Sequence, residues 1–508
     1  MGSRTLNSKR NIIVSGVGCL LTPVFGMIIK SAMLRSFNVE YIGLTSVFGS
    51  VIGILTLAEF GFSSVAIINL FKPIREGDTA TVRRLLAYYK RAYRMIGAAI
   101  LILGICASPL LRVFIKDVDK IRENIYMLYF FYIADTAVGY MLFGYKEALF
   151  NAAQRLDVTK TIYMIVYVLK TVLQFIAIAV FRNFYLFALL LVLGTVLYSV
   201  FLEITSRRMF GAYYPDGMID AATQHTVREQ VMGLSIANIM VASRNSLDSI
   251  ILTSFFGLAL AGQYSNYFLI YNAVAGIISV FVRSIRASVG DSIVSEDVEK
   301  NLSDFTRMEF LLNIFITACT AYLISLYQPF MKIWMGKDLM FDDGIMMLFV
   351  LYYYVRAIPG VRHAYFGALG YWWKAKWIYI AELVLNITLN ILLGKAFGVA
   401  GIITASIITD FVFEYYLVNN ILFRDYFGRG KGRYYVDRIV YTIIAAVTCG
   451  LSYYLCNRVL LYEGIGGIIL RLGLCTLAII CVVPSLLFVL KREYLHDSVV
   501  FTKQIIKA

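Results

Sequence analysis

Charged residues stand inside stretches of sequence that are otherwise apolar, and these residues offer the clearest chemistry in the chain. An ionisable group deep in a membrane-spanning helix costs on the order of 2.5–3.5 kcal/mol, so it usually faces a water-filled cavity or pairs with an opposite charge. Buried cations can hold an anion such as a diphosphate. The cationic positions are Lys30, Lys146, Lys170, Arg244, Arg283, Arg356, Arg362 and Arg471, and the acidic ones are Glu59, Asp135, Asp248, Glu382, Asp410 and Glu414.

Arg244 and Asp248 share one helical face, because they are four residues apart. The arginine could grip a diphosphate bidentately when the aspartate releases it. The alternative is a structural salt bridge within the helix, which makes the insertion of both charges tolerable. Polar neighbours such as Ser249 favour a helix that lines an aqueous cavity, with Asp248 as an acidic or gating residue there.

Three tyrosines follow at helical spacing, Tyr264, Tyr267 and Tyr271, with Asn272 next to the last of them. Aromatic faces and amide donors suit sugar rings, which present apolar C–H faces and hydroxyl edges. The candidate glycan contacts are therefore Tyr267, Tyr271, Asn272 and, from the preceding stretch, Asn245. The alternative is an interfacial tyrosine belt, which suits Tyr264 best and also includes Tyr267, whereas Tyr271 and Asn272 lie about two turns deeper.

Two carboxylates, Asp410 and Glu414, also stand four residues apart. Two such groups should not both ionise in a low dielectric, so one pKa rises or a cation lies between them. This pattern indicates a coupling site for H⁺ or Na⁺. The alternative is that each carboxylate pairs with Lys170 or Arg356 on another helix.

The remaining cations extend the candidate anion site. Lys30, near the outer end of the first apolar run, either snorkels to the headgroups or joins Arg244, Arg283 and Glu59 in a charged cavity. Arg356 lies in the middle of its run and has no easy snorkelling route. Pro359 follows it and could kink the helix. The candidate diphosphate-binding cations are Lys30, Arg244, Arg283, Arg356 and Arg362.

The composition places these residues in a membrane. Of 508 residues 60% are hydrophobic and 16% are charged, and the mean hydropathy is +0.73. Soluble domains carry about 25% charged residues, so lipid must be the solvent of most of this chain. The seven cysteines lie in apolar runs without metal-type spacing and are interpreted as small core residues.

A bilayer needs roughly 20 apolar residues per helix, which predicts an all-α polytopic membrane protein of about 14 transmembrane helices. The first is expected to be uncleaved. Lys and Arg concentrate in alternate loops, above all 71–94, which places both termini in the cytoplasm. The predicted spans are 11–34, 42–70, 95–115, 125–149, 161–181, 184–205, 232–255, 263–285, 307–328, 344–367, 376–396, 401–423, 437–457 and 467–490.

The spacing of the spans predicts two lobes. Residues 1–205 form an N-terminal six-helix lobe, 206–231 a basic amphipathic cytoplasmic connector and 232–423 a C-terminal six-helix lobe. Residues 424–508 add two transmembrane helices and a cytoplasmic tail. Parallel repeats of this kind place the substrate between the halves.

Several classes of protein are disfavoured. The net charge of +15 is mostly a topology signal and a contact with anionic lipid, so nucleic acid is not an expected partner. There is no GxxxxGK[ST] loop for ATP. The short exterior loops, of which 329–343 is the largest, offer no catalytic domain, and Asp338, Asp342 and Asp343 are interpreted as turn residues. We expect a transporter rather than an enzyme, without cofactor or metal.

A family resemblance runs in order along nearly the whole chain. Its elements are Ala58–Phe62, Lys72–Asp78, Asp248–Leu252, Phe256–Gly257, Gly262–Ser265, Pro329–Phe330 with Trp334–Gly336, and Phe397–Gly401. Together they resemble the signatures of polysaccharide flippases in the multidrug/oligosaccharidyl-lipid/polysaccharide exporter superfamily.

The resemblance implies twelve to fourteen helices in two lobes that work by alternating access. It implies transfer of undecaprenyl-diphosphate-linked oligosaccharide repeat units, for O-antigen or capsule, from the inner to the outer leaflet of the bacterial plasma membrane. The alternatives are a cation-coupled multidrug or toxin exporter of the same superfamily and a membrane polysaccharide polymerase or ligase. An exporter of organic cations would want a net-negative cavity, whereas Lys30, Arg244 and Arg283 make this one lean positive.

Overall fold

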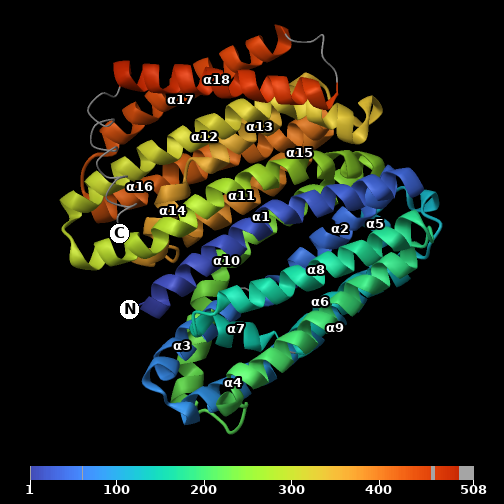
Figure 1. The fold of residues 1–508 in the computed structure, drawn as a ribbon, viewed down its shortest axis with the longest axis vertical. Coiled ribbons are helices and arrows are strands. Elements are labelled where there is room, and N and C mark those ends of the chain that lie inside the picture. The colour runs from blue at the N-terminus through green and yellow to red at the C-terminus, as the bar shows by residue number, and fades with distance from the viewer. Residues whose placement is uncertain (1, 60, 143, 459–463, 491–508) are drawn as a thin grey trace. The chain divides into compact units, whose positions relative to one another are not determined.

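The computed structural model is built of helices, with no strand in the described residues (Figure 1). These residues are 2–59, 61–142, 144–458 and 464–490; within them, the side chains of 2–15, 17, 19, 20, 58, 233–246, 287, 458, 489 and 490 lie outside the description. The chain divides into two compact units, Met1–Leu269 and Ile270–Ala508, each with hydrophobic clusters of its own.

The first unit is a bundle of long helices joined by short turns. Its elements are α1 (Gly2–Ser36), α2 (Val39–Leu55), η1 (Thr56–Glu59), α3 (Phe62–Glu76), α4 (Thr79–Ala107), η2 (Ser108–Leu110), α5 (Leu111–Phe114), η3 (Val118–Lys120), α6 (Ile125–Leu142), α7 (Tyr145–Ala152), α8 (Leu156–Ala179), α9 (Phe184–Met209), η4 (Gly211–Tyr213) and α10 (Ala221–Phe256). Helix α11 (Leu258–Ser295) begins in this unit and continues into the second. Helices α4, α6, α9 and α8 pack in that order (Figure 1).

The second unit is built around α12. Its further elements are α12 (Val298–Met335), η5 (Lys337–Leu339), α13 (Asp343–Ala357), α14 (Gly360–Leu369), α15 (Lys376–Thr409), η6 (Asp410–Val418), α16 (Asn419–Leu422), η7 (Phe423–Phe427), α17 (Lys431–Arg458) and α18 (Ile465–Leu490). Helix α12 packs against α13, α17 and α18 (Figure 1). The most apolar stretch of α12 is 61% buried, against 22% in α18, so α12 is a central helix and α18 a peripheral one.

Ten helices in the described part of the chain are long and apolar enough to cross a bilayer. This confirms the prediction of an all-α polytopic membrane protein. The division into lobes at 205 and 232 stays a prediction.

One predicted span is interrupted. The predicted span 42–70 is broken, since α2 ends at Leu55 and α3 starts only after Gly61, whose φ of 108° lies outside the helical region. A hydropathy window does not detect this break, because it leaves the apolar character of the sequence unchanged.

The predicted division between spans 376–396 and 401–423 is present in the structure. Helix α15 consists of two helical segments that meet at Gly398 (φ 63°). The amide of Asn386 donates hydrogen bonds to the hydroxyls of Ser406 and Thr409, so the two segments run back along each other. The second segment is π-helical from Asp410 to Val418.

Aspartate side chains in the predicted loops cap the N-termini of the helices that follow. Asp78 accepts a hydrogen bond from the Thr81 amide at the start of α4, and Asp220 accepts one from the Thr223 amide at the start of α10. Hydrogen bonds from Thr81 lower the pKa of Asp78 below its ordinary value. Asp342 caps α13 in the same way, which agrees with its interpretation as a turn residue.

Two glycines let α2 and the start of α11 approach to backbone contact. A Cβ at Gly43 would overlap the carbonyl oxygen of Leu258, and a Cβ at Gly262 would lie 2.5 Å from the carbonyl oxygen of Val39. Small residues allow such close approach of helices within a membrane. Gly262 also belongs to the family signature noted above, and its packing gives that position a physical reason.

We expect Gly43→Ala and Gly262→Ala each to lower the free energy of unfolding by about 1–3 kcal/mol, because the added methyl group meets backbone atoms that cannot move aside. The measurement is the thermal midpoint of the purified protein in detergent. Gly49→Ala in the same helix is the control, since nothing lies within 4 Å of the added Cβ there. Equal midpoints in all three variants would contradict the close contact.

Candidate functional site

In the first unit, Lys30 of α1 reaches across to α11. Its Nζ donates hydrogen bonds to the hydroxyl and the carbonyl oxygen of Ser265, each at 2.7 Å. Both partners are neutral, and no carboxylate among the described residues lies within ion-pair distance of Nζ. The half-buried lysine is therefore held by two oriented neutral acceptors and has no counter-ion among those residues.

Asp248 of α10 is buried and accepts a hydrogen bond from the Tyr264 hydroxyl at 3.3 Å. One residue on, the hydroxyls of Ser249 and Ser46 lie 3.3 Å apart, so this face of α10 meets α2 through polar contacts. The predicted partners on α10, Arg244 and Asn245, lie outside the described side chains. The pairing of Arg244 with Asp248 stays a prediction.

Other charges of the first unit are met by nearby side chains. The Tyr140 hydroxyl donates to Glu59 at 3.3 Å, and the Thr195 hydroxyl donates to Asp135. Lys146, which is buried, forms an ion pair with Glu203. These contacts join helices that are distant in sequence, and they explain how the bundle tolerates the charges.

In the second unit, each carboxylate of the predicted coupling pair is met by its own arginine. Both oxygens of Asp410 lie 3.4 Å from Nη1 of Arg356. Glu414 forms an ion pair with Arg362, whose side chain is 1% exposed, and it lies 3.3 Å from Nε2 of His363. Of the alternatives that the sequence left open for Asp410, the pairing with Arg356 is therefore present in the structure.

The local backbone explains how these pairs align. Helix α13 ends at Ala357 and α14 begins after Pro359, so Arg356 and Arg362 lie on either side of the break. Asp410 and Glu414 lie in the π-helical segment η6, a local widening often found at functional sites. Arg362 keeps two buried donors, Nε and Nη1, without a hydrogen-bond partner in the described structure.

The predicted cations do not form one cluster within either unit. Arg356 and Arg362 are engaged by carboxylates, whereas Arg283 on α11 is exposed and makes no ion pair to a described residue. In the first unit, Lys30 is the one predicted diphosphate-binding cation whose side chain the structure describes, because the side chain of Arg244 lies outside the description.

The candidate glycan contacts differ from one another in their surroundings. Tyr271 is buried and stacks on Tyr352 with ring centroids 5.2 Å apart, and Tyr353 meets it edge-on. Tyr267 is fully buried in the first unit, whereas Asn272 is exposed on α11. Of the candidate glycan contacts whose side chains the structure describes, Asn272 is the exposed one.

One buried pair was not predicted from the sequence. Arg438 of α17 forms an ion pair with Glu309 of α12 and donates from Nη1 to Asn313 at 2.8 Å. Both charged side chains are almost completely buried. Arg438 lies near the start of its predicted span, where a cation is ordinarily expected to contact the lipid headgroups. The signal in the sequence was the spacing of Glu309 and Asn313, which lie four residues apart and therefore on one face of α12, where they could meet a buried cation.

Comparison with known proteins supplies the fold class. No family model and no curated relative matches the sequence. Solved structures of membrane transporters do match, among them an inward-facing multidrug resistance MATE family transporter of the MOP superfamily, at a TM-score of 0.59 and 14% identity, covering 79% of this chain and 95% of that one.

Lipid II flippase MurJ in an inward closed conformation matches at a TM-score of 0.71 and 13% identity, covering 95% of this chain and all of that one. The Vibrio cholerae MATE transporter VcmN matches at 0.57 and 13%, covering 84% and 99%. The chain therefore has the fold of these transporters.

We expect Glu414→Gln to destabilise the protein by about 3–5 kcal/mol, because it leaves the buried Arg362 charge without its counter-ion. The thermal midpoint of the purified variant measures this. The double variant Arg362→Met/Glu414→Leu removes both charges and should recover most of the loss. A single variant as stable as the unmodified protein would show that the ion pair is not what holds α14 against η6.

Proposed function

We propose that this protein is a flippase that moves undecaprenyl-diphosphate-linked oligosaccharide repeat units from the inner to the outer leaflet of a bacterial plasma membrane by alternating access. The fold supports this proposal, since the lipid II flippase aligns over 95% of the chain and the two MATE transporters over 79% and 84%. The motifs that resemble polysaccharide flippases support the cargo class. The sugar would serve a surface polysaccharide such as O-antigen or capsule.

The observation that carries the proposal is the environment of Lys30. The described partner of this lysine is the neutral Ser265 rather than a carboxylate, so an anion that approached it would not have to displace a counter-ion. A diphosphate oxygen is a strong acceptor for such a donor, and a charge-assisted hydrogen bond is about twice as strong as a neutral one. A positive charge at Lys30 would repel an organic cation, which disfavours the drug exporter.

Neutralising Lys30 should abolish most of the transfer. We expect Lys30→Gln, which retains a donor for Ser265, to lower the rate of lipid-linked glycan flipping in proteoliposomes about tenfold or more, since a hydrogen bond to a charged group contributes about 1.5–3 kcal/mol. Lys30→Arg should retain activity.

The control for Lys30→Gln is Lys160→Gln, which removes the same charge from an exposed position on α8. Full activity of a correctly folded Lys30→Gln protein would contradict a role of this lysine in binding the anion. Faster movement of an organic cation by Lys30→Gln would instead favour the drug exporter.

The same proposal includes coupling to H⁺ or Na⁺ at Asp410 and Glu414. The arrangement around η6 supports this part of the proposal. When a cation neutralises Asp410 or Glu414, that carboxylate can release its partner, Arg356 or Arg362, and it can bind the arginine again when the cation leaves. Exchange between such paired states is a physical means of linking ion binding to a change of conformation.

We expect Asp410→Asn to remove the response of flipping to an imposed pH or Na⁺ gradient while leaving some gradient-independent transfer. The control is Asp425→Asn, because Asp425 pairs with Lys374 and Arg424 near the end of the same helical run. The measurement is flipping in proteoliposomes with and without each gradient. A variant at Asp410 that still responds as the unmodified protein does would refute the coupling role.

A further inference from the structure

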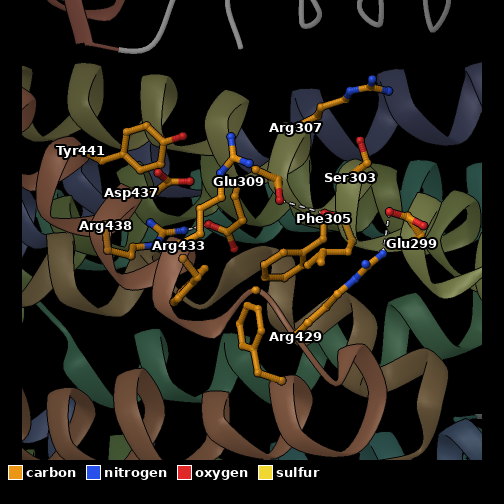
Figure 2. A pocket seen from close by; sticks show the side chains of 15 residues that line it. Glu299, Ser303, Phe305, Arg307, Glu309, Arg429, Arg433, Asp437, Arg438 and Tyr441 are labelled. Carbon is orange, nitrogen blue, oxygen red and sulfur yellow. Dashed lines mark hydrogen bonds and ion pairs between the residues drawn. The ribbon is translucent and has the colours of Figure 1, made fainter. Parts of the chain in front are cut away.

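A cavity of about 440 Å³ lies in the second unit between the starts of α12 and α17, and Figure 2 shows the side chains that surround it. None of the residues assigned above to cargo or ion coupling lines it. Its volume falls in the range of cavities that hold small ligands or headgroups.

The lining of this cavity carries a small excess of arginines over carboxylates, and Arg307, Arg429 and Arg438 each form an ion pair. Four arginines against three carboxylates leave an excess of positive charge among the lining residues. The arginines are Arg307, Arg429, Arg433 and Arg438, and the carboxylates are Glu299, Glu309 and Asp437. Guanidinium groups gathered in this way suit a phosphate, whose oxygens can accept bidentate hydrogen bonds.

Arg438 provides a buried donor at the cavity. Its side chain is 2% exposed, its Nη1 donates to Asn313 and its guanidinium pairs with Glu309. Its Nε has no hydrogen-bond partner in the described structure. A buried donor without an acceptor costs about 1–3 kcal/mol, or more on a charged group, and an acceptor in the cavity would relieve that cost.

The rim of the cavity joins the starts of two helices. Nη2 of Arg429 lies 2.7 Å from Glu299 at the beginning of α12, and Figure 2 shows these side chains pointing toward each other. Gly430, with a φ of 83°, turns the chain between Arg429 and Arg433. Helices α12 and α17 correspond to spans that, by the distribution of Lys and Arg, begin on the cytoplasmic side. On this topology the rim faces the inner leaflet.

The wall of the cavity is aromatic. Phe305 of α12 packs against Phe423 and Tyr434, with ring centroids 5.8 and 6.0 Å apart, and these two rings lie 5.1 Å from each other. A cationic rim over an apolar wall matches an amphiphile, with a phosphate at one end and hydrocarbon at the other.

We propose that this cavity binds the phosphate group of an anionic phospholipid from the inner leaflet. Basic pockets between transmembrane helices on the cytoplasmic side bind anionic headgroups. The site is independent of the cargo, because every residue that forms it belongs to α12, η7, α17 or the η7–α17 connection. A lipid bound there would bridge the C-terminal helix pair α17–α18 to the central helix α12.

The test is native mass spectrometry of the full-length protein in detergent, titrated with phosphatidylglycerol and, separately, with phosphatidylcholine. We expect Arg429→Ala/Arg433→Ala to weaken phosphatidylglycerol binding about tenfold or more, at about 1 kcal/mol for each cation lost, and to leave phosphatidylcholine binding unchanged. The matched control is Arg424→Ala/Lys431→Ala, which removes two charges from the same segment without touching the cavity lining.

The outcomes separate the sources of the phosphate group. Equal weakening by the control would overturn the site in favour of general charge attraction, and so would equal binding of the two lipids. Displacement of phosphatidylglycerol by millimolar inorganic phosphate would assign the cavity to a free anion and overturn the lipid. If the double variant does not remain monodisperse, Arg433→Gln alone keeps the Arg429–Glu299 rim and should still weaken phosphatidylglycerol binding several-fold.

Discussion

The cost of placing a charge in an apolar environment governs the interior of this protein. An ion moved out of water loses several kcal/mol of solvation, and only a well-placed partner offsets that loss. The helices are brought together at such partners, often between residues far apart in the chain. The pairs are Lys146 with Glu203, Arg356 with Asp410, Arg362 with Glu414 and Arg438 with Glu309. Lys30 differs from them because Ser265 supplies dipoles and no charge, and this difference sets it apart as a candidate for binding an anion.

Much of the fold could be predicted, because a bilayer imposes a simple length rule on apolar helices. The composition and the run lengths suffice for an all-α membrane protein, and helices such as α8 and α9 fall close to their predicted spans. The turn at Gly398 falls in the predicted gap between two spans, whereas the break at Gly61 escaped prediction. That break depends on backbone torsion at a single glycine, which leaves the surrounding hydropathy unchanged.

The candidate sites were predictable by residue type and much less by partner. Charge within apolar runs is enough to identify Lys30, Arg356 and Arg362, but spacing along one helix reveals only partners on that helix. Asp410 and Glu414 look like a shared cation site from their spacing, yet each meets an arginine that a different segment supplies. Arg438 was missed for a related reason, since its burial comes from α12 rather than from its own sequence neighbours.

Helix α11 belongs to both compact units, and its first turns are locked to α2 by backbone contact at Gly43 and Gly262. An α-helix is stiff over a few turns, because each residue is tied to the turn before it. The first turns of α11, which carry Ser265, therefore keep a fixed register against α2 within the first unit. In mechanical terms α2 and the start of α11 are clamped together, so any reorientation of α2 carries with it the two oxygens that hold Lys30.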